Sequence, residues 1–171
     1  MQAALDAGLK PVKVNIVLVR GFNDDEIVEF ARLARRRDLV VRFIEFMPLD
    51  ADHTWSPDRV VTAREIVATI SPVFPLVEIP RHSPSETALR YRFADGQGEI
   101  GIVAPVSIPF CGQCSRIRVT ADGKLRTCLF SLREHDVRHL VRNGASDRDI
   151  EHFFLRVVHQ KEPGHRISEP D

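Results

Sequence analysis

The chain contains three cysteines, Cys111, Cys114 and Cys128, and their spacing is C-x2-C-x13-C. A C-x2-C pair lets two thiolates reach one metal centre from a tight turn, and a third cysteine can arrive from the facing strand of a hairpin. Three soft sulfur ligands suit an iron–sulfur cluster or zinc far better than magnesium or calcium. The pattern therefore predicts a metal centre on this segment.

Two arginines follow the second cysteine closely. If the segment is extended, Cys114, Arg116 and Arg118 share one face, because side chains alternate along a strand. A soft metal centre would then lie beside two fixed positive charges. This arrangement favours an anionic ligand, such as a phosphorylated one, bound next to the metal.

The position of Cys128 depends on the turn at Asp122-Gly123. A two-residue turn would pair Ile117 with Cys128 and direct that thiol away from the arginine face. A three-residue loop over 121–123, with Gly123 in the left-handed conformation, pairs Arg116 with Cys128 instead. Only the second register brings the three sulfurs to one side, so we predict the three-residue loop.

Other interpretations of these residues are simpler. The cysteines could be unrelated buried thiols, and the arginines could belong to a solvated strand face. A disulfide within the C-x2-C pair would need an oxidising compartment, which nothing in the sequence indicates. The clustering of all three cysteines within one segment favours the metal centre.

Composition excludes several classes of protein. Lys+Arg and Asp+Glu are both 24 among 171 residues, so binding of nucleic acid would need a local basic patch. No apolar run approaches the ~20 residues of a membrane span, and the first residues do not resemble a signal peptide. We expect a cytoplasmic chain that binds neither nucleic acid nor membrane, with one domain or a small domain plus an appendage.

The first half of the chain has a strand–helix–strand pattern. Apolar strands are predicted over 12–19 and 39–47, and a helix over 23–37 that begins with a capping box at Asn23-Asp-Asp-Glu26. This βαβ unit implies parallel strands. Lys13 and Asn15 share one strand face, whereas Arg42 and Glu45 lie on opposite faces by parity.

Two parallel strands alone cannot form a covered sheet, so we expect further strands from another chain or from a missing part of the protein. A second capping box, Thr62 to Glu65, predicts a helix to about Ile70. Four prolines over 72–84 indicate an extended connector, and a hairpin follows over 89–103. Helices are predicted over 134–142 and 147–160, the second with Ser146 as N-cap, and the tail from Glu162 is expected to be loose.

Several motifs together resemble one family. The chain is similar, from about residue 4 to residue 167, to the C-terminal portion of the GTP 3′,8-cyclase family of radical S-adenosylmethionine (SAM) enzymes in molybdenum-cofactor biosynthesis. The segments that carry the resemblance are Pro11-Val-Lys13-Val-Asn15, Arg20-Gly-Phe-Asn23-Asp-Asp-Glu-Ile27, Arg42-Phe-Ile-Glu45-Phe-Met47, Trp55, Phe110-Cys111-Gly-Gln-Cys114-Ser-Arg116-Ile-Arg118 and Leu125-Arg-Thr-Cys128-Leu-Phe130.

The resemblance implies a fold and a reaction. The fold class is α/β, the C-terminal part of an incomplete (β/α) TIM-like radical SAM barrel plus an α+β cluster-binding extension. The implied domains are 1–50 (last βα units of the barrel), 51–110 (connector helix and hairpin) and 111–171 (cluster and GTP-binding region). The family converts GTP to (8S)-3′,8-cyclo-7,8-dihydroguanosine 5′-triphosphate by SAM radical chemistry, which makes it a lyase.

The resemblance also implies ligands for particular residues. Cys111, Cys114 and Cys128 match the ligands of an auxiliary three-cysteine [4Fe–4S] cluster that leaves one iron open. The implied GTP contacts are Lys13, Arg42, Arg116, Ile117 and Arg118, and Met47 matches a SAM contact. No residue is assigned a catalytic role.

The chain also departs from the family pattern. The family binds SAM on a second [4Fe–4S] cluster held by C-x3-C-x2-C, and no cysteine precedes Cys111. We therefore expect this chain alone to be inactive and to need an N-terminal radical SAM half as partner; a homodimer is left open. The rival hypotheses are a free-standing nucleotide-binding module with zinc on the three cysteines and His135, and an auxiliary-cluster domain of another radical SAM enzyme.

Overall fold

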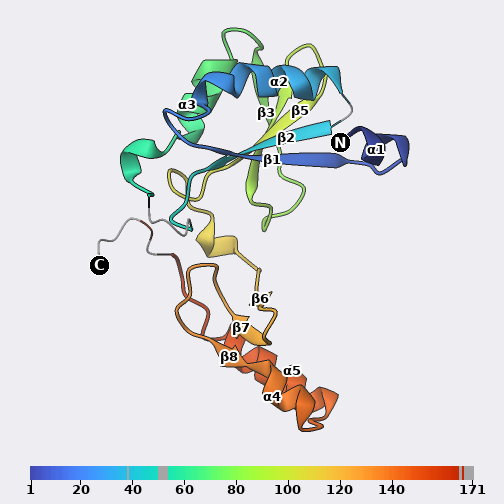
Figure 1. Ribbon diagram of the computed structural model, residues 1–171, viewed down its shortest axis with the longest axis vertical. Helices are drawn as coiled ribbons and strands as arrows, with labels where there is room; N and C mark the ends of the chain where they lie inside the picture. Colours follow the sequence, from blue (N-terminus) through green and yellow to red (C-terminus); the bar gives the residue numbers. More distant parts are fainter. Residues whose placement is uncertain (38, 50–53, 166, 168–171) are drawn as a thin grey trace. The chain divides into compact units, whose positions relative to one another are not determined.

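The computed structural model describes residues 1–171 except 38, 50–53, 166 and 168–171. The described chain divides into two compact units, residues 1–110 and 111–171. Each unit has its own β-sheet (Figure 1). The two units are described separately below.

The first unit is built on a five-stranded mixed sheet with the order β1-β2-β5-β4-β3 (Figure 1). Strands β1, β2 and β5 run parallel, whereas β4 and β3 continue the sheet in antiparallel pairing. The α/β class expected from the sequence is therefore confirmed. The strands are β1 (Val12–Leu18), β2 (Leu39–Glu45), β3 (Leu76–Ile79), β4 (Ala88–Phe93) and β5 (Glu99–Val103).

The sheet gains three further strands from this chain itself, which the sequence analysis did not predict. The predicted hairpin of β4 and β5 joins the sheet, and β5 pairs parallel to β2 with Val41 opposite Ile100. The segment between the prolines, predicted only as an extended connector, contains strand β3. This pairing is non-local, so the local sequence pattern could not reveal it.

One face of this sheet forms the hydrophobic core. Helices α2 (Ile27–Arg36) and α3 (Ala63–Ile70) lie on the same side of the sheet (Figure 1). A short helix, α1 (Gln2–Asp6), precedes β1 in the chain. The buried residues of both helices pack into one cluster with the strands: Ile27, Ala31, Ala34, Ala63, Ile66 and Ile70 with Val41, Phe43, Ile100 and Ile102. Among the described residues, no helix is long and apolar enough to cross a membrane.

The two predicted capping boxes had different outcomes. At α3 the Thr62 side chain accepts from Glu65 N and the Glu65 carboxylate accepts from Thr62 N, as predicted. The box at Asn23 was wrong, because its side chain makes no capping bond. Instead, Asn23 donates to the carbonyl of Val17 and accepts from the amide of Val19, so it closes the turn that follows β1.

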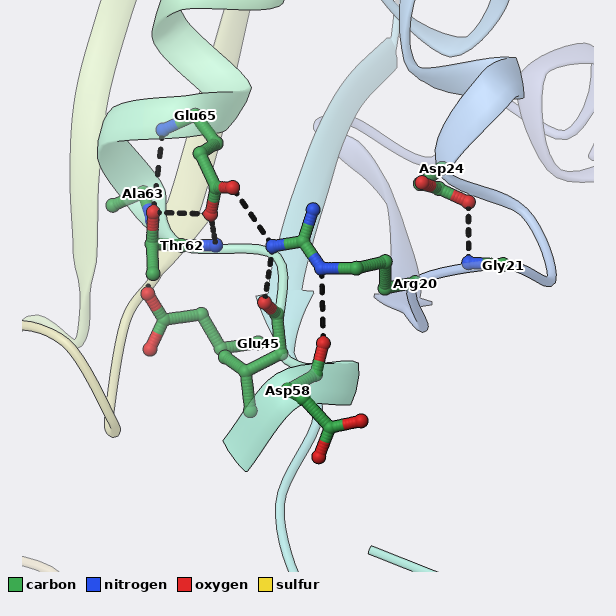
Figure 2. A network of polar contacts seen from close by, with 9 residues as sticks. Arg20, Gly21, Asp24, Glu45, Asp58, Thr62, Ala63 and Glu65 are labelled. Atoms are coloured by element: carbon green, nitrogen blue, oxygen red, sulfur yellow. Dashed lines mark hydrogen bonds and ion pairs between the residues drawn. The ribbon is translucent and has the colours of Figure 1, made fainter. Parts of the chain in front are cut away.

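Arg20 ties the end of β1 to the chain that precedes α3 (Figure 2). Its guanidinium donates to the carbonyl oxygens of Asp58 at 3.0 Å and Val60 at 2.8 Å, and to the Glu65 carboxylate at 2.7 Å. The hydrogen bonds from the Thr62 side chain and backbone, followed by Arg20, lower the pKa of Glu65 to about 2. The cap of α3 and the exit of β1 therefore stabilise each other.

Glu45, at the end of β2, is a charged side chain inside the core, with 0% of its surface exposed. One carboxylate oxygen accepts from the amide of Ala63 at 2.9 Å and from the hydroxyl of Ser107. The other accepts from the amides of Val106 at 2.9 Å and Ser107 at 2.8 Å. Figure 2 shows its approach to Ala63. Glu45 therefore joins β2, the start of α3 and the segment after β5.

The second unit contains a small three-stranded antiparallel sheet and two helices. The elements are the 3-10 turn η3 (Cys111–Gln113), β6 (Arg118–Val119), β7 (Lys124–Arg126), β8 (His135–Asp136), α4 (Val137–Arg142) and α5 (Asp147–Val158). The helix predicted from residue 134 begins later, because residues 135–136 pair with β7 and Asp136 caps α4 by accepting from His139 N. Ser146 caps α5 as predicted.

The tail was expected to be loose from Glu162, and this was wrong for its first residues. The Glu162 carboxylate accepts hydrogen bonds from two buried hydroxyl groups, and the His165 ring lies edge-on to Phe130 with centroids 5.6 Å apart. Long-range contacts of this kind leave no local sequence signal. Residues 166 and 168–171 lie outside the described residues.

We predict that Glu45→Gln lowers the free energy of unfolding by about 3 kcal/mol, because an amide NH2 would face backbone donors in a buried site. Urea unfolding followed by the fluorescence of Trp55, the only tryptophan, measures this. The control is Glu29→Gln on α2, whose side chain is 69% exposed and whose loss should cost at most about 0.5 kcal/mol. Equal stability of the two variants would contradict the role of Glu45.

Candidate functional site

The first two cysteines lie on one tight turn. Cys111 begins η3, and the amide of Cys114 donates to the carbonyl of Cys111 at 3.0 Å. All three cysteines are free thiols, and all are half-buried. We call residues 111–131 the cysteine hairpin.

The register of the cysteine hairpin confirms the predicted three-residue loop. Val119 lies opposite Leu125 and Arg118 opposite Arg126. The loop is closed by the amide of Thr120, which donates to the carbonyl of Lys124 at 2.9 Å. Gly123 has φ +81°, the left-handed conformation that the loop requires. Continued by two residues, this register sets Arg116 opposite Cys128.

Side chains alternate along the strand that leaves Cys114. Half-buried residues (Cys114, Arg116, Arg118) alternate with exposed ones (Ser115, Ile117, Val119). The second cysteine and the two arginines therefore share a face, as the sequence predicts. Ile117 is on the opposite face and is 37% exposed.

Positive charge surrounds the Cys114 thiol. Arg116 donates from Nη2 to Cys114 Sγ at 3.1 Å. Burial acts to raise the pKa of Cys114, but hydrogen bonds from the backbone and side chain of Arg116, with the charges of Arg116 and Lys161, outweigh it and lower the pKa below its ordinary value. A lowered pKa favours the thiolate, which is the form that ligates a metal.

The hairpin does not form a closed site for a single ion. Among the described residues, no three His, Cys, Asp or Glu side chains are grouped so that they could hold one metal ion. His135, the expected fourth zinc ligand, lies opposite Leu125, so it shares the face of Leu125 and not that of Arg126. A [4Fe–4S] cluster attaches each thiolate to a different iron. The structure therefore does not group the three thiols at one metal site as the sequence analysis expected, and the metal centre stays a prediction.

A second polar surface lies on the sheet of the first unit, on the face opposite α2 and α3. Asn15 lies across from Arg42, and Arg42 lies across from Gly101. Lys13, one step before Asn15 on the same face, is exposed, so it reaches solvent from within the strand. The two cations expected to bind phosphate therefore occupy one face of the sheet.

Arg42 has room on this face because Gly101 lacks a side chain. A Cβ at Gly101 would lie 3.3 Å from Cγ of Arg42 and 3.3 Å from Cβ of Ala88. The guanidinium reaches toward Thr87, with Nη2 3.4 Å from its hydroxyl oxygen. Arg42 thus lies flat over β5.

Met47 follows the carboxyl end of β2. Its carbonyl accepts from the amide of Leu49 at 2.8 Å, and the neighbouring carbonyl of Phe46 accepts from the indole of Trp55 at 2.9 Å. The structure places Met47 at the strand end where parallel sheets bind ligands. Its assignment to SAM stays a prediction.

Sequence reasoning missed two residues of the site. Lys161 and Glu162 follow α5 and contact both strands of the cysteine hairpin. Their signal in the sequence is weak: two adjacent opposite charges between a helix and a Pro-Gly pair.

Comparison with known proteins identifies the family. The family model described as Molybdenum Cofactor Synthesis C matches residues 39–167. The chain belongs to this family. Curated relatives of the chain are named GTP 3′,8-cyclase.

The relative from Moorella thermoacetica is 44% identical over 168 residues, which cover 98% of this chain and 52% of the relative. The relative from Mycolicibacterium smegmatis is 42% identical over 175 residues, covering 100% of this chain and 48% of the relative. The relative from Streptomyces coelicolor is 40% identical over 171 residues, which cover 99% of this chain and 50% of the relative. The chain thus spans about half the length of the curated relatives that it matches.

We predict that Gly123→Ala destabilises the second unit by about 2 kcal/mol or more, because φ is positive there and non-glycine residues are strained. The new Cβ would also lie 2.5 Å from Cβ of Arg138. Thermal unfolding followed by circular dichroism measures the loss. Gly112→Ala is the matched control, since its Cβ would meet no atom within 4 Å; an equal melting temperature for both variants would contradict the role of Gly123.

Proposed function

We propose that this chain provides the auxiliary-cluster and GTP-binding half of a GTP 3′,8-cyclase. The observation that carries the proposal is the cysteine hairpin: three free thiols whose second member shares a strand face with Arg116 and Arg118. Its support is the similarity of nearly the whole chain to proteins of that name. The proposal extends to the finer fold, in which the parallel strands β1, β2 and β5 belong to an incomplete (β/α) barrel and residues 111–171 form its extension.

Each part of the hairpin has a role in the proposed site. Cys111 and Cys114 would hold the cluster from one turn and Cys128 from the facing strand. A three-cysteine [4Fe–4S] cluster supplies one iron that no protein side chain ligates. Arg116 stabilises the thiolate of Cys114, and Arg118, two residues on, extends the positive face toward the phosphates of GTP. The backbone of Ile117 lies between them.

The sheet of the first unit carries the other residues that we propose to bind ligands. Lys13 and Arg42 offer their charges on the same strand face, where charge-assisted hydrogen bonds to phosphate are strong. Met47 would contact SAM at the end of β2. We assign residues 1–50 to the barrel and 51–110 to the connector, whose hairpin adds β5 to the barrel strands.

Radical formation is not assigned to these residues. The family's second [4Fe–4S] cluster, which binds SAM, needs three further cysteines, and these 171 residues contain none outside the hairpin. The proposed role of this segment is therefore to bind and orient GTP. Formation of the cyclised product would require a radical SAM half as partner.

Calorimetric titration with GTP of the anaerobically reconstituted chain tests the proposal. Arg116→Ala and Arg118→Ala should each weaken GTP binding about 10-fold or more, since a hydrogen bond to a charged group contributes roughly 1.5–3 kcal/mol. Iron and sulfide content, measured in each sample, should stay at the wild-type level. Arg148→Ala, an exposed arginine on α5, is the matched control and should bind like the wild type. Wild-type affinity in both hairpin variants would overturn the proposal.

A further inference from the structure

Lys161 joins the two strands of the cysteine hairpin where their ladder has ended. The last paired residues of the ladder are Arg118 and Arg126. Beyond them, Lys161 Nζ donates to the carbonyl of Arg116 at 2.9 Å and to the carbonyl of Thr127. An ammonium group has three donors and can bridge two carbonyls in this way. Lys161 thus links the two strands beyond the last pair of the ladder, next to the cysteines.

Glu162 holds the turn that carries Cys128. Its carboxylate accepts from the hydroxyl of Thr127 at 2.5 Å and from the hydroxyl of Ser131 at 2.6 Å. These two residues are only 2% and 5% exposed, so each hydroxyl needs a partner inside the protein. The amide of Ser131 in turn donates to the carbonyl of Cys128 at 3.3 Å. Glu162 therefore binds the chain on both sides of Cys128, through Thr127 and Ser131.

Lys161 and Glu162 act on neighbouring parts of the hairpin, and we call these two residues the clamp. Lys161 fixes the distance between the strand of Cys114 and the strand of Cys128, and Glu162 fixes the conformation of the turn beyond. Both belong to the segment after α5, so the helix carries the clamp. Hydrogen-bond networks that include buried groups, such as the hydroxyls of Thr127 and Ser131, rigidify the segments they join.

We propose that Lys161 and Glu162 are positioning residues that hold together the two strands carrying Cys114 and Cys128, the second and third proposed cluster ligands. This inference rests on the proposed function, because it concerns the same cluster. Neighbours that orient metal ligands typically change metal affinity about 10–100-fold when they are removed. The clamp would keep the thiols in place before the cluster is bound and retain it afterwards.

Hydrogen exchange on the metal-free chain tests the clamp without reference to a metal. Lys161→Ala and Glu162→Gln should each speed amide exchange in 114–118 and 127–131 about 10-fold, because each variant loses hydrogen bonds made by a charged group. Lys124→Ala is the matched control: this lysine lies in the same hairpin but pairs with Asp136 at 2.9 Å near the loop. In the Lys124→Ala variant, the amide exchange rates of residues 127–131 should stay at the wild-type level. Unchanged exchange in both clamp variants would overturn the proposal.

Cluster retention then tests the link to function. After anaerobic reconstitution, the visible absorbance of Lys161→Ala and Glu162→Gln should bleach about 10-fold faster in the presence of an iron chelator. Lys161→Arg, which keeps the charge and the donors, should restore most of the retention. Equal bleaching rates in the wild type and both clamp variants would contradict the clamp. A wild-type chain that takes up no iron would instead contradict the proposed function, and the exchange experiment would still decide the clamp.

Discussion

The left-handed turn at Gly123 is the constraint on which the cysteine hairpin depends. It sets the register of the ladder, which would place Arg116 opposite Cys128 if continued by two residues, and a one-residue slip would turn that cysteine to the other face. The same residue receives α4: its carbonyl accepts from the amides of Val137 at 3.1 Å and Arg138 at 3.2 Å. The backbone conformation of Gly123 therefore determines both the face of the hairpin on which Cys128 lies and the position of the start of α4.

Strand parity places the charged side chains of β2 on opposite faces of the first unit's sheet. Glu45 lies on the core face, where four donors satisfy it and join three segments. Arg42, three residues earlier, lies on the opposite face over Gly101 and remains available to an anion. A buried charge with complete hydrogen bonding stabilises the fold, whereas a charge on the polar face is suited to binding.

Features that depend on neighbouring residues were mostly predicted correctly from the sequence, whereas contacts between distant residues were not predicted. The loop at Asp122-Gly123 and the cap at Thr62 depend on residues within four positions of each other, so the pattern contains the information. The pairing of β5 with β2 joins residues nearly 60 apart, and Lys161 contacts Arg116 from 45 residues away. No local preference encodes such contacts. Asn23 shows the opposite failure, since a side chain suited to a cap binds the backbone of the preceding strand instead.

The proposed function depends on the three cysteines holding an iron–sulfur cluster. The most direct test is to reconstitute the 171-residue chain anaerobically with iron and sulfide and to measure iron, sulfide and zinc per chain with the visible spectrum. The account predicts about four irons and about four sulfides per chain with a broad brown absorbance, all lost when the three cysteines are replaced by serine. One zinc per chain without colour, or iron that survives replacement of the cysteines, would contradict it.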